Sequence, residues 1–487
     1  LHGHRWKETS PRIDSDTIDS QTVGMGAPYE NKFVTAAGEL EAGFDDFRTV
    51  RPEMAFDEAF AVGAGGAHGS AGDYLFHCHL FPHYGEGMWG IFRVNDEEQP
   101  DLEPLKNNDP PIPADSETSG FPDFIPGEKG DPAPEPPYEY NREPTHEEED
   151  ALRDGVPPGA PYTDPADPEL EYGDDGDFDP EEGEVREYTI VALEADIVYN
   201  DAGHHDPEGI VYVLEEDAEK VRSGEMNPEP LFIRANVGDL VKVTLKNETA
   251  GGKSNHIHFV SYDVLGSDSL SNGYNYEQQA NPQAVEPGDE LKTQWYADEE
   301  GTIFFHDHIT GISDVMNGSF CGLIVEPPNA TWRDPFSGEE IRSGAQAIIE
   351  NPDGEDFREI GLHLQDFAQL RKRNGEFVNP DIQHNENAGT MAINYRNAPY
   401  YERDDFDPAY VHSSAAHGDP PTPLFEAYEG DPVRFRVAQG SYEEFHNFQI
   451  HGGQFSIDAE GLAPEDTTSQ IVGTSEAFTF SLVADNG

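Results

Sequence analysis

Five potential metal ligands fall within one short segment of the chain. His77, Cys78 and His79 are consecutive, and His83 and Met88 follow them. On an extended strand successive side chains point to opposite faces, so Cys78 faces away from His77 and His79. One strand can therefore serve two metal sites.

The sulfur ligand indicates copper. A Cys78 thiolate, the His83 imidazole and Met88 as a weak axial ligand supply most of a blue-copper centre of the His₂Cys type. The second histidine of such a centre must come from elsewhere. The alternative is a buried structural cysteine flanked by surface histidines, and five potential ligands at these spacings make it the weaker interpretation.

Two further pairs of histidines have the same spacing, with one residue between them. They are His256 with His258, and His306 with His308. On strands, each pair directs both imidazoles to one face, which suits a shared multinuclear site and is unfavourable on a buried apolar face. A single pair could equally be surface or core histidines. Three pairs, counting the one around the cysteine, favour metal binding.

The elements that must position these residues are short β-strands. Runs rich in β-branched and aromatic residues are separated by Gly, Pro, Asn and Asp turns, and helical periodicity is scarce. The pattern predicts an all-β fold of sandwiches, with a second unit that starts near Trp332. The expected strands are 188–193, 240–245, 301–306, 322–325, 360–364, 433–437 and 448–451.

The composition is strongly acidic. The 487 residues include 98 Asp and Glu against 29 Lys and Arg, which gives a formal charge of −69. This charge excludes nucleic-acid binding. We interpret it as the surface of a salt-adapted protein from a halophilic organism, together with an acidic, disordered Pro- and Gly-rich linker over 97–185. Hydrophobic residues still make up 35% of the chain, which is enough for real cores.

Cysteine usage and hydropathy set further limits. The two cysteines, Cys78 and Cys321, provide no disulfide framework. Cys321 has no histidine at ligand spacing and is expected to be a small buried hydrophobe. No run of ~18 apolar residues occurs, so we expect no membrane span.

The chain also repeats itself. Leu1-His2-Gly3 matches Ile450-His451-Gly452, and residues 20–24 match 469–473 at the same ungapped offset. A shorter echo relates 230–239 to 423–431. The repeats predict tandem related domains, and we expect the chain to have been cut from a longer tandem protein.

The histidine-rich segments resemble those of the multicopper oxidases, laccase-like enzymes built of cupredoxin domains, which are Greek-key β-sandwiches. The resemblance implies tandem cupredoxin-like domains that hold type 1, type 2 and binuclear type 3 copper. It implies oxidation of a small reducing substrate, a phenol or a metal ion such as Mn²⁺, coupled to reduction of O₂ to water. By this resemblance the type 1 ligands are Cys78, His83 and Met88, the type 2 ligand is His256, and the type 3 ligands are His2, His77, His79, His258, His306 and His308.

The resemblance also suggests catalytic roles beside the ligands. Electrons would pass from Cys78 through His77 and His79 to the trinuclear cluster. His4 would be a neighbour and not a ligand. The candidate proton donors for oxygen reduction are Asp263, Asp268 and Asp307, of which we name Asp268 as catalytic.

The second copy of the ligand segment departs from the family pattern. His446 stands at a type 1 position and His451 at a type 3 position, but Gln449 replaces the type 2 histidine. We include His446 and His451 as candidate copper ligands that could instead be relics. Two further ligands implied by the resemblance would precede Leu1.

The sequence thus predicts four regions. Residues 1–96 form the C-terminal part of a cupredoxin domain with the type 1 segment, 97–185 the linker, 186–331 a cupredoxin domain with two His-x-His segments, and 332–487 a second cupredoxin domain truncated at its C-terminus. The segment order resembles the large manganese-oxidising subgroup. We expect an exported enzyme that is extracellular or at the cell surface, and oligomers are possible. The alternatives are a non-catalytic copper-binding array for storage or electron transfer, and an acidic scaffold with relic sites.

Overall fold

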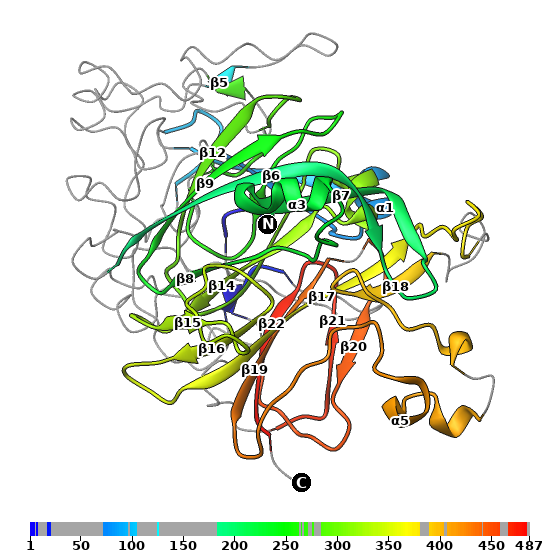
Figure 1. Cartoon of the computed structure of the whole chain (residues 1–487). Helices are drawn as coiled ribbons and strands as arrows, with labels where there is room; N and C mark the ends of the chain where they lie inside the picture. The colour runs from blue at the N-terminus through cyan, green and yellow to red at the C-terminus, as the bar shows by residue number, and fades with distance from the viewer. Residues whose placement is uncertain are drawn as a thin grey trace.

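Strands dominate the structure (Figure 1), which confirms the all-β class. The computed structural model describes residues 1–4, 6–7, 17–20, 72–95, 98–104, 124–125, 183–262, 264, 267–270, 275–276, 284–379, 389–403, 407–440, 442–457 and 466–484. Most of the predicted linker and Asp263 lie outside the described residues.

Two four-stranded sheets form the first sandwich. One has the order β12 (Glu290–Tyr296), β9 (Leu240–Asn247), β6 (Val185–Val198), β7 (His205–Leu214). The other has the order β10 (His256–Ile257), β13 (Gly301–His306), β14 (Phe320–Glu326), β8 (Phe232–Asn236). The predicted strands 188–193, 240–245, 301–306 and 322–325 all lie within these elements.

The core of this sandwich follows from the period-2 pattern of its strands. Val241, Val243 and Leu245 of β9 are buried in the same cluster as Ile303 and Phe305 of β13. Alternate residues of a strand share one face, so each sheet presents an apolar face to the other. β14 is buried along its whole length, and Cys321 on it is fully buried, as predicted.

The second unit is built on one larger sheet. It has the order β15 (Thr331–Arg333), β16 (Gln346–Glu350), β17 (Phe357–Ala368), β19 (Pro432–Gln439), β22 (Ala477–Val483), with β18 (Thr390–Ile393) also paired to β17. A separate ribbon joins β20 (His446–Gln449) to β21 (Ser469–Val472). The sheet matches the predicted strands 360–364 and 433–437.

The two units share a strand pattern. β6 pairs in parallel with β9, which pairs antiparallel with β12. β17, β19 and β22 repeat these directions. The turn before β9 has Gly238 at φ 94° and the turn before β19 has Gly430 at φ 95°, conformations that favour glycine. This is the structural counterpart of the echo between 230–239 and 423–431, while the exact domain bounds stay a prediction.

Apolar packing and buried charge join the two units. One hydrophobic cluster contains Val191 and Phe320 from the first unit and Ala368 and Ala438 from the second. Beside it lies a buried ion-pair network in which arginines alternate with glutamates. The network joins Arg234 of β8, Glu326 of β14, Glu359 of β17 and Arg436 of β19, whose side chains are all 0% exposed.

A hairpin from the N-terminal region carries the cysteine segment onto the first sandwich. It consists of β3 (Gly72–His77), α1 (Phe81–Gly85) and β4 (Trp89–Val94). The His2 backbone N–H donates to Leu75 O at 2.9 Å, which fixes Leu1 to His4 along β3. Phe81 packs edge-on against His306 with ring centroids 5.9 Å apart.

The prediction of one extended strand through His79 is wrong. β3 ends at His77, and Cys78 and His79 lie in the turn that leads into α1. Pro82 lies in the first turn of that helix, where its fixed φ favours helical backbone. The expected strand 448–451 is also displaced, since β20 ends at Gln449 before the Gly452 turn.

The remaining elements are short and lie outside the sequence prediction. They are β1 (Trp6–Lys7), β2 (Thr17–Ile18), β5 (Phe124–Ile125), β11 (Asn275–Tyr276), α3 (Glu215–Arg222), α4 (Gly311–Asp314), α5 (Ser414–His417) and the 3₁₀ turns η2 (Val315–Asn317), η3 (Tyr400–Glu402) and η4 (Pro408–Tyr410). No helix in the described part of the chain is long and apolar enough to cross a membrane.

Candidate metal centre

Sheet pairing brings the two His-x-His segments together. β10 and β13 are antiparallel neighbours in which His256 lies opposite His306. The His258 N–H then donates to Phe304 O at 3.0 Å, which continues the pairing beyond β10. The two pairs therefore lie side by side at the β10 edge of the sheet, and the hairpin of β3 and β4 meets them there.

The histidines gather in two sets. The His79 set comprises His79, His258 and His306, which each offer a ligand atom within 4.8 Å of the others. The Nε2 atoms of His258 and His306 are 3.4 Å apart.

The His77 set comprises His2, His77, His256 and His308. His2, His256 and His308 also lie within 4.8 Å of one another. The Nε2 atom of His77 is 3.2 Å from that of His2 and 3.3 Å from that of His308. The two halves of each predicted pair thus fall into different sets.

Hydrogen bonds at the opposite ring nitrogen fix the tautomer of five of these histidines. Each Nδ1 faces a carbonyl or carboxylate oxygen and so carries the proton. The partners are Asp268 Oδ1 for His2 (3.0 Å), Cys78 O for His77 (2.9 Å), Asp268 O for His256 (2.8 Å), Asp19 Oδ2 for His258 (2.9 Å) and Asp307 O for His306 (2.9 Å). Their Nε2 lone pairs therefore point into the two sets.

Burial keeps the imidazoles neutral. Desolvation, followed by the neighbouring histidines, lowers the pKa of His2, His79 and His306 well below its usual value. Burial likewise lowers the pKa of His308 to about 4. Neutral imidazole is the form that binds a metal.

This arrangement fits copper. Nε2 lone pairs that face one another at 3.2–3.4 Å repel unless a cation lies between them. Among the residues that the structure describes, neither buried ring nitrogen of His79 has a hydrogen-bond partner, and a metal ion would supply one. The oxygen partners at Nδ1 are the arrangement that orients metal-binding histidines in proteins.

The cysteine segment forms a separate group beside the two sets. Cys78 Sγ is 3.6 Å from His83 Nδ1. The Cys78 N–H donates to Met88 O at 2.9 Å, and the Met88 N–H donates to His83 O at 3.0 Å. The residues that carry the thiol, imidazole and thioether are thus held on one tight loop, with Met88 56% exposed. His77 and His79, on either side of Cys78, each enter a different set.

A continuous cavity of about 810 Å³ connects these groups. Histidines of both sets line it, together with Cys78, His83 and Met88. A small reductant and dioxygen could therefore both reach the histidines and the cysteine segment.

The remaining predicted residues have different surroundings. His446 and His451 belong to neither set; His446 and Gln449 line another cavity, of about 730 Å³, and His451 is exposed. His4 Nδ1 donates to His2 O at 2.9 Å, and the His4 ring packs edge-on against Tyr74. His4 therefore lies next to His2, one of the candidate ligands.

The acidic residues differ in what they touch. Asp268 is fully buried and accepts from Tyr262 Oη at 2.7 Å as well as from His2. Asp307 faces away from the sets, toward Thr310 and Lys253.

Sequence reasoning missed Asp19. It holds His258 Nδ1 and accepts from the Phe259 N–H at 3.0 Å. Although burial acts to raise it, the contact with His258 lowers the pKa of Asp19 below its usual value. No spacing signal links Asp19 to His258, because tertiary structure alone brings them together.

A family model described as multicopper oxidase matches residues 204–329. The chain carries a multicopper oxidase domain. The match includes both His-x-His segments, whose geometry it therefore explains. At the level of the family it confirms a copper-dependent oxidoreductase that uses dioxygen, with type 1, type 2 and type 3 copper as its cofactors.

Several solved copper proteins are distantly similar to this chain. The multi-copper oxidase from Pseudomonas thermotolerans is 16% identical, with 62% of this chain and 59% of that chain covered and a TM-score of 0.40. A laccase from Botrytis aclada is 18% identical, with 63% and 48% covered and a TM-score of 0.39. A copper nitrite reductase from Nitrosomonas europaea is 18% identical, with 62% and 85% covered and a TM-score of 0.39. No curated protein matches the chain.

Proposed function

We propose that this protein couples one-electron oxidation of a small reducing substrate, a phenol or a metal ion such as Mn²⁺, to four-electron reduction of O₂ to water. The observation that carries the proposal is the convergence of two adjoining histidine sets next to a cysteine segment. When bound there, copper supplies the one-electron redox steps and the site of oxygen reduction.

The proposed ligands follow the two sets. The His79 set would hold one type 3 copper, and His2, His77 and His308 would hold the other. His256 would be the type 2 ligand, and Cys78, His83 and Met88 the type 1 ligands. In this assignment Cys78 is linked through the backbone to one histidine of each type 3 site, which gives electrons a short covalent route.

Asp268 is the proposed proton donor. Its buried carboxylate touches His2 Nδ1 and Tyr262 Oη, so it can hold or move a proton at the edge of the His77 set. The same carboxylate orients His2, and a variant at Asp268 would affect both roles.

The wider setting is also proposed. The acidity supports a salt-adapted protein in an extracellular or cell-surface location, and an oligomer is possible. We propose the domain bounds 1–96, 97–185, 186–331 and 332–487. We propose His446 and His451 as further copper ligands, which metal analysis of a His446→Ala, His451→Ala double variant would test.

Oxygen consumption and copper content test the main proposal together. Copper-loaded protein should consume O₂ with a phenol or Mn²⁺, and His306→Ala should abolish that consumption and lower the copper content. His412→Ala, at an exposed histidine, is the matched control and should change neither. Copper binding without O₂ consumption by the unaltered protein would instead support the non-catalytic copper array.

A further inference from the structure

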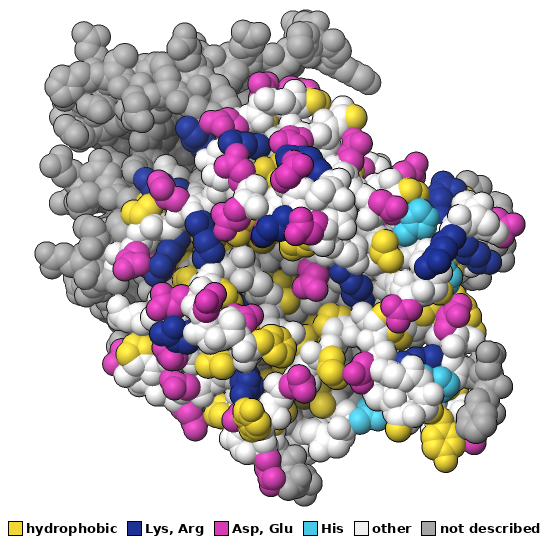
Figure 2. Space-filling view, viewed as in Figure 1, with side chains coloured by type: hydrophobic (Ala, Val, Ile, Leu, Met, Phe, Trp, Pro, Cys, Tyr) yellow, Lys and Arg dark blue, Asp and Glu magenta, His cyan; other side chains and the backbone are white. Residues whose placement is uncertain are grey.

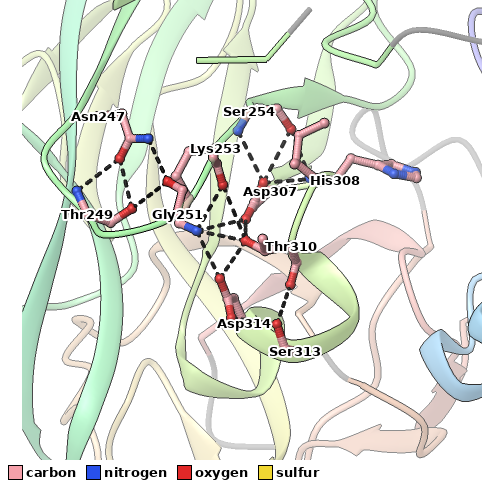
Figure 3. A network of polar contacts seen from close by, with 12 residues as sticks. Asn247, Thr249, Gly251, Lys253, Ser254, Asp307, His308, Thr310, Ser313 and Asp314 are labelled. Atoms are coloured by element: carbon pink, nitrogen blue, oxygen red, sulfur yellow. Dashed lines mark hydrogen bonds and ion pairs between the residues drawn. The ribbon is translucent and has the colours of Figure 1, made fainter. Parts of the chain in front are cut away.

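A buried lysine lies where the two His-x-His segments meet. Lys253 precedes His256 by three residues, and its side chain is only 1% exposed. Its ammonium group donates to Gly252 O at 3.1 Å, Thr310 Oγ1 at 2.7 Å and Asp314 Oδ2 at 2.9 Å (Figure 3). All three of its N–H donors are thus used, two of them on the segment that follows His308.

The contacts enclose the backbone on both sides of His308. Asp307 Oδ1 accepts from the Ser254 N–H at 3.1 Å and the Ile309 N–H at 3.0 Å, while the His308 N–H donates to Ser254 Oγ at 2.9 Å (Figure 3). The segments before His256 and after His306 are therefore fastened to each other at several points.

Charge balance makes the lysine the centre of this arrangement. The Thr310 hydroxyl lies within hydrogen-bond distance of Asp307 Oδ2 (2.6 Å) and of Asp314 Oδ2. Asp307 is fully buried and the Asp314 side chain is 15% exposed. Two carboxylates so close together in a poorly solvated site repel each other unless a cation lies between them. Lys253 is that cation, 2.9 Å from one carboxylate and 3.5 Å from the other.

We propose that Lys253 is a positioning residue for His308: by holding Thr310 and Asp314 it fixes the 307–310 backbone and so the distance of His308 Nε2 from His77. This inference rests on the proposed function, because it assumes that His308 binds copper. Without the ammonium group, Asp307 and Asp314 would repel each other and disturb the 307–310 backbone, so His308 would no longer be held facing its set.

The first test is Lys253→Met in the full chain. Loss of a residue that orients a metal ligand costs about 10- to 100-fold in metal affinity, so copper at the histidine sets should be lost to a chelator at least about tenfold faster. The visible absorption of the Cys78 site should persist, which global unfolding would not allow. The control is Lys246→Met, a 37% exposed lysine paired with Glu215, which should match the unaltered protein.

A second variant separates charge from packing. Lys253→Met with Asp314→Asn removes the repulsion as well as the ammonium, and should recover much of the copper retention. Equal retention in Lys253→Met and the unaltered protein, or no recovery in the double variant, would overturn the inference. If Lys253→Met does not fold, Thr310→Val removes the bridging hydroxyl alone and should show a smaller loss in the same direction; unchanged retention in Thr310→Val would contradict the inference. Failure of the unaltered protein to bind copper would instead refute the proposed function.

Discussion

At the scale of single residues, the site depends on what each imidazole does with its second nitrogen. Nδ1 of His77 and of His306 donates to the carbonyl of the next residue, Cys78 or Asp307. This local contact needs no distant partner, so the His-x-His spacing alone was enough to identify these side chains as candidate ligands. His258 depends on Asp19 and His2 on Asp268, partners that only the folded chain supplies.

Cys78 permits the sharpest prediction at this scale. If its thiolate binds copper, Cys78→Ser should abolish the intense visible thiolate-to-copper absorption, because oxygen cannot replace sulfur in that transition. Cys321→Ala is the control, since Cys321 is fully buried in β14, and should leave the band intact. A visible band that survives in Cys78→Ser would refute the assignment.

Asp206 gives a pH dependence that is independent of copper. Burial first, and then Glu208 and Asp196, raise its pKa from 3.8 to about 7. Between those values the folded protein holds a proton that the unfolded chain has lost, so the contribution of Asp206 to stability is greatest below about pH 4 and is lost as the pH rises through 7.

Asp206→Asn should therefore raise the midpoint of thermal unfolding at pH 8 relative to the unaltered protein, and raise it much less at pH 5. Differential scanning calorimetry at the two pH values checks this. Asp201→Asn, at an exposed turn position, should show no such difference. An equal effect of Asp206→Asn at both pH values would mean that its carboxyl group titrates normally.

At the scale of elements, sequence patterns succeeded where a strand is regular and failed where tertiary contacts decide. The prediction for 301–306 matches β13 residue for residue, because its apolar run is bounded by Gly301 and by the polar Asp307. The turn at Cys78 was not predicted, because the alternation of ligands over 77–79 favoured one extended strand. α3 has only two buried residues, Ala218 and Val221, too few for a clear helical period.

The buried ion-pair network is expected to stabilise the contact between the two units. Although burial acts to raise it, Arg234 and Arg436 lower the pKa of Glu359 to about 2. Arg436→Met would remove one of the two arginines that pair with Glu326 and Glu359. Removing one partner of such a buried ion pair lowers the free energy of unfolding by about 3–5 kcal/mol. Urea unfolding should show that loss.

Arg333→Met is the comparison for the network, since Arg333 forms ion pairs with Glu340 and Glu350 at a partly exposed site. It should change the unfolding midpoint little, because exposed pairs are well screened. Equal effects of the two variants would show that the buried network contributes no more than a surface ion pair.

At the scale of the whole molecule, charged side chains occur in two different environments, the exposed surface and the buried interior. Figure 2 shows acidic side chains spread over the visible face, with Lys and Arg between them. Inside, several carboxylates are paired with arginine or lysine, as at Glu359 and Asp307. The excess of acidic over basic side chains, which gives the formal charge of −69, therefore does not come from these buried pairs. Repulsion between the remaining carboxylates can be screened by salt.

This separation predicts a salt-dependent stability with a definite pH limit. The Debye length falls from ~10 Å at 0.1 M to ~3 Å at 1 M, so added salt screens distant carboxylates but leaves the buried pairs nearly unaffected. The midpoint of thermal unfolding of the full chain should rise by several degrees or more between about 0.1 M and 2 M KCl at pH 7. Near pH 4.2, the pI of the sequence, the net charge is close to zero and the same salt should have much less effect. An equal rise at both pH values would indicate a general effect of salt on apolar burial, and a flat or falling midpoint at pH 7 would show that the acidity of the chain does not adapt its folded domains to salt.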